Sequence, residues 1–180
     1  MLRKIKTGHI FALYLPLFIL MSCQSNARQS NTMDQKENNQ NPHYSRTDTT
    51  HLQVADKEWK KILPDDLYQV ARKQGTERAF TGKYWDSETK GTYYCAVCGN
   101  RLFRSDAKFA SSCGWPSFFE PARKGSVYYK EDDSYNMHRI EVKCARCDSH
   151  LGHIFDDGPP PTHKRYCMNS ICLDFEPDRQ

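Results

Sequence analysis

Cysteines are the residues whose spacing says most about the chemistry of this chain. Eight occur in 180 residues, which is many for this length but too few for a small scaffold stapled by disulfides. Four of them form two Cys-x-x-Cys pairs, Cys95 with Cys98 in "CAVC" and Cys144 with Cys147 in "CARC". Two such pairs are the thiolate arrangement that structural zinc selects, so we predict one structural Zn²⁺ per chain.

Other uses of these two pairs have to be weighed. Disulfides are the first alternative, because the chain carries signals for export. The second is a disulfide oxidoreductase that uses one Cys-x-x-Cys pair, although two redox pairs in one small domain would be unusual. Four thiolates fill a tetrahedron, so a zinc ion here would stabilise the fold and would not catalyse.

Cys167 has neighbours that suit a reactive thiol. It lies in "RYCMNS", with Arg165 two residues before it and Asn169 two residues after it. Alternate residues of a strand share a face, so a guanidinium, a thiol and an amide would line one site. A guanidinium lowers the pKa of a nearby thiol, and the thiolate is the nucleophile. The alternative is a buried core cysteine, which is common.

Two further loops carry residues that could join Cys167. Cys113 lies in "SSCGWPSF", a loop interrupted by serine, glycine and proline. In "HLGHIFDDGPPP", His150 and His153 can converge on one pocket, and Phe155 adds an apolar wall. The two histidines could instead be zinc ligands, but the four cysteines already complete a tetrahedral site.

The elements that must position these residues follow from the hydrophobic pattern. Apolar residues at helical spacing in "VADKEWKKILPDDLYQVARKQG" predict two short helices, with Asp56 capping the first, Pro64 opening the second and Gly75 ending it. Beyond Gly75, short aromatic and β-branched runs alternate with turn residues. We predict a mainly antiparallel β domain over about residues 76–177, with the helices packed outside it.

The N-terminal segment has the pattern of an export signal. Residues 1–22 combine a basic start, "MLRKIK", with an apolar stretch that is short for a membrane span. They lead into "LMSC", which resembles a lipoprotein signal with Cys23 as the acylated residue. The alternatives are an uncleaved signal anchor and ordinary signal peptidase cleavage. We expect an exported protein anchored by lipid to a bacterial cell membrane, on the periplasmic or outer-membrane face.

Composition divides the rest of the chain into a tether and a domain. Residues 23–53 are rich in Asn, Gln, Ser and Thr, and we predict a lipidated cysteine followed by a disordered tether. Residues 54–180 form the predicted domain. The net charge of +4 falls to about +1 without the three basic residues of "MLRKIK", and no basic stripe with aromatic residues appears. Nucleic acid is therefore not an expected partner.

The longer motifs resemble one enzyme family. "CGWPSF", "HLGHIFDDGP" and "RYCMNS", framed by the two Cys-x-x-Cys pairs, are similar to type B methionine sulfoxide reductases. The resemblance runs from about Leu63 to Phe175 and includes "GTE" and "FTGKY". It implies a β-rich, barrel-like domain with a zinc knuckle made by four cysteines. It also implies a peptide-methionine (R)-S-oxide reductase, whose substrate is the R epimer of methionine sulfoxide, chiefly in oxidised proteins.

The resemblance also implies roles for individual residues. Cys167 would attack the sulfoxide sulfur and become a sulfenic acid, and Cys113 would condense with it to a disulfide. A thioredoxin-like protein would reduce that disulfide, and the expected export of the chain, not the resemblance, suggests that this partner is membrane-tethered or periplasmic. His150 and His153 would protonate the sulfoxide oxygen. Trp115 and Phe155 would form an apolar pocket for the S-methyl group. Asn169 and Arg165 would organise water and charge.

Several points stay open at this level. A non-catalytic zinc-knuckle binding module is the main competing function, and we expect a monomer in either case. Cys172, between Ile171 and Leu173, is read as a buried apolar residue or as a slow alternative resolving thiol. His163 stands where the family commonly has glycine, which leaves the conformation of that loop open.

Overall fold

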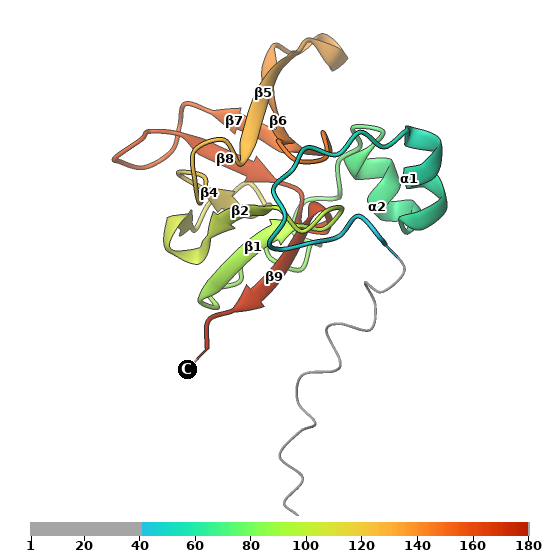
Figure 1. The fold of residues 1–180 in the computed structure, drawn as a ribbon. Helices are drawn as coiled ribbons and strands as arrows, with labels where there is room; N and C mark the ends of the chain where they lie inside the picture. The colour runs from blue at the N-terminus through green and yellow to red at the C-terminus, as the bar shows by residue number, and fades with distance from the viewer. Residues whose placement is uncertain (1–40, 180) are drawn as a thin grey trace, which may run out of the picture.

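The computed structural model describes residues 41–179, and the predicted signal peptide, Cys23 and the start of the predicted tether lie outside this range. The described part begins with two short helices, α1 (Asp56–Ile62) and α2 (Asp65–Ala71). They lie together on one side of the strands (Figure 1). Among the described residues, no helix is long and apolar enough to cross a membrane.

Both helices form where the apolar spacing predicted them, but their ends differ from the prediction. Asp56 lies inside α1 and does not cap it; its carboxylate pairs with Arg72, while Ala55 occupies the N-cap without a side-chain bond. Pro64 precedes the first residue of α2 as predicted. The helix ends at Ala71, before Gly75, and the chain leaves it through Gln74, whose φ of 58° lies in the left-handed region. A favourable ion pair in the first turn therefore replaces the expected cap.

The strands form two antiparallel sheets. One has the order β2-β1-β9 and the other the order β3-β4-β8-β7-β6-β5. The bounds are β1 Gly91–Cys95, β2 Arg101–Arg104, β3 Lys108–Phe109, β4 Ser117–Phe118, β5 Val127–Asp132, β6 Arg139–Cys144, β7 His150–Phe155, β8 Arg165–Met168 and β9 Leu173–Pro177. Three 3-10 helices lie between them: Ser105–Ala107, Ser134–Asn136 and Ser170–Cys172.

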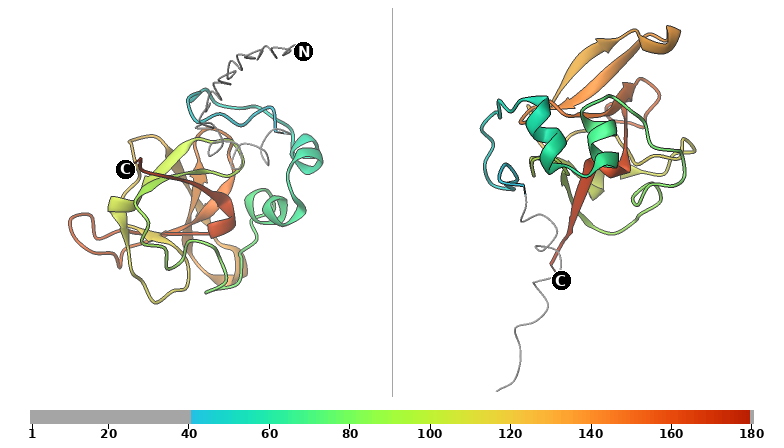
Figure 2. Two further views of the ribbon diagram at one scale, coloured as in Figure 1. Left: turned by 90° about the horizontal axis from the view of Figure 1, so that it is seen from below. Right: turned by 90° about the vertical axis from the view of Figure 1, so that its right-hand side faces the viewer.

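The mainly β, antiparallel prediction is confirmed, but the described residues form no closed barrel. Closure requires the outer strands of a sheet to pair with each other. In the larger sheet β3 and β5 lie at opposite ends of the strand order, and in the smaller sheet β2 and β9 do. The β5–β6 hairpin projects from the body of the molecule instead of closing it (Figure 2).

Aromatic side chains join the two sheets in a common core. Phe103 on β2 stacks on Phe118 of β4 with ring centroids 4.4 Å apart, and Tyr93 on β1 contacts the same ring at 5.0 Å. All three side chains are fully buried. Such pairs add to the free energy gained from burying their area, so this cluster holds β4, and with it β8, against the small sheet.

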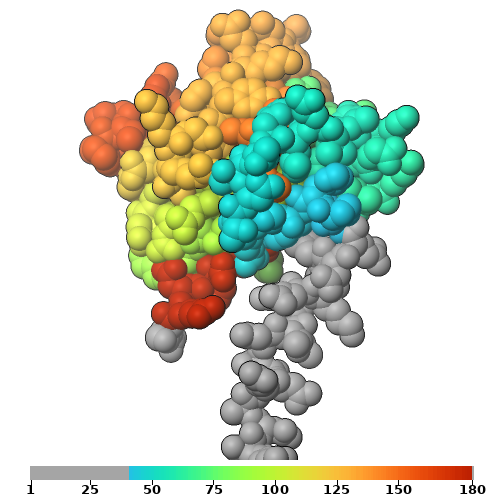
Figure 3. Space-filling view, in the orientation of Figure 1, coloured from blue at the N-terminus to red at the C-terminus, as the bar shows by residue number. Residues whose placement is uncertain are grey.

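Residues 41–53, which we call the strap, differ from the predicted tether. They lie along the surface of the domain, coloured blue to cyan in Figure 3. The buried side chain of Arg146 donates to the carbonyl of His43 at 2.9 Å and to the carboxylate of Asp48 at 2.9 Å. The strap is thus held by polar bonds to the domain, which its polar composition does not reveal.

Candidate functional site

Two thiols from distant parts of the chain meet where β4 and β8 pair in the larger sheet. The sulfur of Cys113 lies 3.5 Å from the sulfur of Cys167. Cys167 is on β8 and pairs with Ser117 of β4, while Cys113 lies in the loop before β4. The antiparallel pairing of β4 and β8 therefore carries the loop thiol to the strand thiol. Both side chains are partly exposed and both are free thiols.

The surroundings of the two thiols push their pKa values apart. Burial raises the pKa of Cys113, but hydrogen bonds from the hydroxyls of Ser111 and Ser117 outweigh it and lower the pKa to about 7. Burial, and then the charge of Cys113, raise the pKa of Cys167 to about 12. Cys113 is therefore the thiol of the pair that ionises first.

The predicted effect of Arg165 on Cys167 is present but is outweighed. Its guanidinium lowers the pKa of the thiol, less than burial and Cys113 raise it. Two 2.8 Å hydrogen bonds join Arg165 to Asp157, and the guanidinium lies 4.4 Å from the centroid of the Phe155 ring. Asp157, a partner that sequence reasoning missed, thus compensates the charge of Arg165 and orients it over Phe155.

A small pocket of about 120 Å³ opens beside Cys167. Four other predicted site residues line it, namely Trp115, His153, Phe155 and Asn169. Its remaining walls are Thr76, Arg139, Gly152 and Met168. Cys113, His150 and Arg165 are not among the described residues that line it. The pocket has the size and the aromatic walls for a methyl-bearing group next to a thiol.

The two predicted histidines converge, but they occupy different positions. His153 pairs across the sheet with Cys167, and the register shifts so that Leu151 is an extra residue in β7. This bulge allows residues three apart to face one side, and the rings of His150 and His153 lie 5.4 Å apart. A Cβ at Gly152 would come within 2.1 Å of the Cys167 carbonyl, so glycine permits the close approach of β7 and β8.

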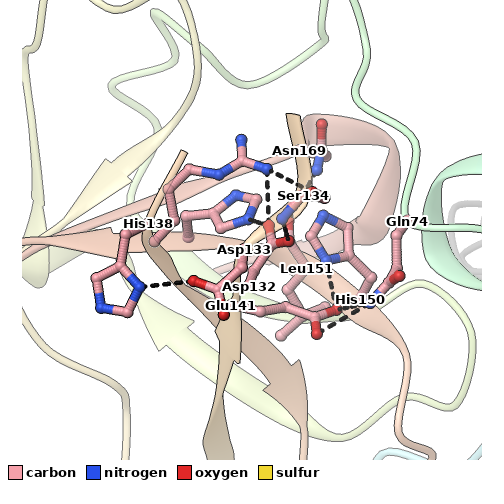
Figure 4. Close-up of polar contacts among 11 residues, drawn as sticks. Gln74, Asp132, Asp133, Ser134, His138, Glu141, His150, Leu151 and Asn169 are labelled. Atoms are coloured by element: carbon pink, nitrogen blue, oxygen red, sulfur yellow. Dashed lines mark hydrogen bonds and ion pairs between the residues drawn. The ribbon is translucent and has the colours of Figure 1, made fainter. Parts of the chain in front are cut away.

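His150 stands behind His153 in a polar, buried environment. Its Nδ1 lies 2.8 Å from the carboxylate of Glu141, which also accepts from Gln74 (Figure 4). His150 and Glu141 are 2% and 1% exposed, so neither reaches solvent freely. Nε2 of His150 has no partner among the described residues. The pair is positioned by the loop after α2, which supplies Gln74.

Asn169 and Trp115 are both hydrogen-bonded to the segment around Glu77, in "GTE". The sequence motifs assigned no role to this segment. The side-chain oxygen of Asn169 accepts from the Glu77 amide at 3.1 Å, and its nitrogen donates to the Leu151 carbonyl at 3.1 Å. The indole of Trp115 donates to the Glu77 carbonyl at 3.2 Å. The Glu77 carboxylate accepts from the Ser170 and Ile171 amides. Both ends of the Asn169 amide therefore anchor the backbone, which differs from the predicted role of ordering water.

The four remaining predicted residues form a candidate metal centre. Cys95, Cys98, Cys144 and Cys147 place their sulfurs within 4.8 Å of one another. Cys95 lies 3.7 Å from Cys147, and Cys98 lies 3.6 Å from Cys144. A tetrahedron with metal–sulfur bonds near 2.3 Å has sulfur–sulfur edges of about 3.8 Å. The cluster could therefore hold one metal ion, and the thiols are free, not joined as disulfides.

A tight turn closes each Cys-x-x-Cys knuckle. Gly99 and Asp148, which follow the two Cys-x-x-Cys pairs, have φ values of 78° and 59°. Their amides donate to the carbonyls of Cys95 and Cys144 at 2.7 and 2.9 Å, which closes each turn. A Cβ at Gly99 would lie 2.6 Å from the Ser45 carbonyl, so the strap also requires glycine there.

The structure gives the surroundings of Cys172 and His163, whose roles the sequence left undecided. Cys172 is fully buried, as predicted, and burial raises the pKa of its thiol, which disfavours a second resolving role. His163 is exposed and has a φ of 55°, a conformation in which glycine is least strained. This explains why glycine suits that position.

Comparison with known proteins places these features in context. A protein-family model, described as the SelR domain, matches residues 63–177. The chain is 51% identical over 129 residues to a protein of Methanosarcina barkeri named peptide methionine sulfoxide reductase MsrB, covering 72% of this chain and 91% of that protein. Proteins of the same name from Pseudomonas putida and Agrobacterium fabrum are 54% identical over 120 residues and 50% identical over 123 residues. These two alignments cover 67% and 68% of this chain, and 90% and 91% of those proteins.

Proposed function

Since the chain belongs to the SelR-domain family of type B methionine sulfoxide reductases, it reduces the R epimer of protein-bound methionine sulfoxide, and we propose that Cys167 and Cys113 carry the reaction. The observation that carries this assignment is the 3.5 Å distance between the two sulfurs beside an aromatic-walled pocket. A thiol that becomes a sulfenic acid needs a second thiol close by to form a disulfide.

Cys167 is the nucleophile in this proposal, although the resting charge lies on Cys113. Cys167 lines the pocket with Trp115 and Phe155, so a methyl sulfoxide held there meets its sulfur. Cys113 can accept the proton of Cys167, because the two sulfurs are 3.5 Å apart and the Cys113 thiol is the first of the two to ionise. The low pKa of Cys113 thereby keeps a base next to a buried nucleophile.

His153 is the acid that protonates the sulfoxide oxygen, and His150 supports it from behind. His153 lines the pocket and is the cross-strand neighbour of Cys167. Oxygen leaves the sulfoxide sulfur for the Cys167 sulfur, one proton is taken up, and methionine leaves. Cys113 then attacks the sulfenic acid, water is released, and a disulfide forms. A thioredoxin-like dithiol protein reduces that disulfide by exchange.

Variants of the three described cysteines outside the metal cluster test these roles with one assay. Purified protein is given each epimer of methionine sulfoxide, first in a single turnover and then with a thioredoxin system. We expect Cys167→Ser to form no methionine, and Cys113→Ser to release one methionine per chain without recycling. Cys172→Ala, outside the pair, is the matched control and should turn over with the R epimer only.

The competing function, a non-catalytic zinc-knuckle binding module, predicts a different pattern. Under it, Cys167→Ser and wild type would form the same negligible amount of methionine. Equal multi-turnover rates for wild type and Cys113→Ser would refute the resolving role alone. The two results are distinguishable, because single-turnover product depends on Cys167 and recycling depends on Cys113.

The ion of the cysteine cluster is proposed to be Zn²⁺. Four buried sulfurs at tetrahedral edge lengths support this choice, since thiolate sites with no open position suit zinc. When bound, the ion cross-links the segments that carry it. Metal analysis of protein purified without chelator should give about one zinc per chain, and iron in its place would refute the assignment.

Attachment to a membrane by lipid at Cys23 is a proposal from sequence. It rests on the basic start, the apolar stretch and "LMSC" in residues 1–23. Labelling cells with a radioactive fatty acid tests it: Cys23→Ser should abolish the label, and Cys172→Ala should retain it. Recovery of unlabelled wild-type protein in the soluble fraction would exclude the anchor.

A further inference from the structure

Asp132 lies at the end of β5 and reaches back to the candidate acid, His153. One oxygen of its carboxylate lies 2.7 Å from Nε2 of His153. The same oxygen accepts from the Arg139 guanidinium at 2.7 Å, and the other oxygen accepts from the Ser134 amide at 3.0 Å. Asp132 and Arg139 are cross-strand partners in the β5–β6 hairpin. The hairpin therefore delivers a fully bonded carboxylate to His153.

A second chamber brings this carboxylate to the reaction pocket. It has a volume of about 540 Å³, and its walls include Asp132, Glu141 and His150. It shares three wall residues with the pocket beside Cys167, namely Thr76, Arg139 and His153. His153 is thus the histidine that separates the chamber from the pocket, with Asp132 on the chamber side.

Charged and titratable groups face His153 from each strand around it. They are Asp132 on β5, Arg139 and Glu141 on β6, His150 on β7 and Cys167 on β8. Burial lowers the pKa of His153, Asp132 opposes that change, and Arg139 and His150 add to it. Hydrogen bonds from Ser134 and His153 hold the pKa of Asp132 far below its usual value, so its carboxylate is ionised and can only accept.

We propose that Asp132 is a positioning residue for His153: its carboxylate keeps the proton on Nε2 and leaves Nδ1 as the nitrogen that exchanges protons with the substrate. This inference rests on the proposed role of His153 as the acid. The imidazolium gives its Nδ1 proton to the sulfoxide oxygen as the Cys167 thiolate takes that oxygen. The ring is then neutral with Nε2–H still bonded to Asp132, and it regains a proton at Nδ1 from water in the chamber.

NMR of the full domain, labelled with ¹⁵N in histidine, tests the positioning directly. In the wild type we expect Nε2 of His153 to stay protonated throughout the neutral range, while Nδ1 titrates. Asp132→Asn removes the charge that favours the imidazolium, so the pKa of His153 should fall by about one unit. Arg139→Gln removes the opposing charge, so the pKa should rise.

The matched control lies at the next position of the same hairpin. Asp133 pairs with His138 at 2.7 Å, and both side chains are largely exposed. Asp133→Asn should leave the pKa of His153 unchanged and lower only that of His138. A merely structural hairpin would give equal, small effects for Asp132→Asn and Asp133→Asn, which would overturn the proposal. So would a wild-type ring protonated on Nδ1 with Nε2 bare.

The kinetic readout separates this proposal from the proposed function. If His153 is the acid, the pH dependence of the single-turnover rate should move to lower pH in Asp132→Asn, in step with the NMR titration. A shifted titration with an unshifted rate profile would retain Asp132 as the partner of His153 and refute the acid role of His153. An unchanged titration would refute the positioning role, whatever the rate.

Discussion

At the scale of single residues, two sulfurs 3.5 Å apart cannot both be ionised without strong repulsion. The hydroxyls of Ser111 and Ser117 favour a negative charge on Cys113, because both lie within hydrogen-bond distance of its sulfur and can donate to a thiolate there. Cys167 lies deeper and has only Arg165 in its favour, and Arg165 is compensated by Asp157. The pair is therefore asymmetric before any substrate binds.

This asymmetry predicts the order in which the reduced protein reacts with an alkylating agent. The pKa of Cys113, lowered to about 7, makes its thiolate dominant above that pH. Cys113 should therefore be alkylated first by iodoacetamide, with a rate that rises through about pH 7. Peptide mass spectrometry at short times measures which cysteine is modified.

Ser111→Ala supplies the control for that experiment. Loss of one hydroxyl donor raises the pKa of Cys113, so the rise in its alkylation rate should move to higher pH. Modification of Cys167 before Cys113 in the wild type would contradict the charge distribution described above.

At the scale of elements, loops and short segments are held by specific contacts that carry little hydrophobic signal. The strap bonds to the first knuckle: the Ser45 amide donates to the carbonyl of Cys98 and the Asn41 side chain to that of Val97, at 3.0 and 2.8 Å. Buried Arg146 lies between the two cysteines of "CARC" and organises these bonds. A segment with few apolar residues, of which Leu52 packs against the core, is thereby ordered against the candidate metal centre.

Removing the Arg146 side chain should loosen the strap. The Ser45 amide donates to the carbonyl of Cys98, and the Leu52 amide donates to the carbonyl of residue 146. In Arg146→Ala, both amide hydrogens should exchange with solvent roughly tenfold faster or more. Hydrogen exchange followed by NMR measures this. Arg101→Ala, at an exposed position, should leave both rates unchanged; equal protection in the two variants would refute the anchoring role.

The loop before β8 gives a second prediction at this scale. A β-branched residue in the left-handed region is strained by about 1–2 kcal/mol, so His163→Val should lower the free energy of unfolding by about that amount. His163→Gly fits the same φ and should lower it by less than about 1 kcal/mol. Urea unfolding compares the two, and equal losses would contradict the φ-based explanation.

At the scale of the whole molecule, the cysteine cluster joins the two sheets. Cys95 ends β1 of the small sheet, and Cys144 ends β6 of the large one. A metal ion held by both knuckles is thus a cross-link between layers that otherwise meet through the aromatic core. Its four ligands are buried, so an empty site would leave thiols with poor partners.

Metal removal should therefore destabilise the entire domain. Structural zinc sites contribute on the order of 10 kcal/mol, so a chelator under reducing conditions should lower the Tm by roughly 30 °C or more. Calorimetry of metal-loaded and metal-free protein measures the difference, and Cys172→Ala should keep both the metal and the Tm difference. An unchanged Tm after verified metal loss would show that the aromatic core alone holds the sheets together.

Much of the fold and site followed from local patterns. Helical spacing around Trp59 and Leu67 predicted α1 and α2, and the two Cys-x-x-Cys pairs predicted one cluster. The cap at Asp56 and the extent of the tether up to residue 53 were not obtained correctly. Each depends on a partner far away in the chain, such as Arg72 for Asp56 and Arg146 for the strap.

The sequence by itself predicted which residue types would do the chemistry: a pair of reactive thiols, two histidines, an aromatic wall and four cysteines that could bind a metal ion. Only the tertiary structure decided which thiol ionises more easily, which histidine borders the pocket, and that Asp132, Arg139 and Asp157 lie beside the candidate site residues. The physical reason is that ionisation and side-chain orientation depend on neighbours within a few ångströms. Antiparallel pairing brings those neighbours together from strands that are distant in sequence.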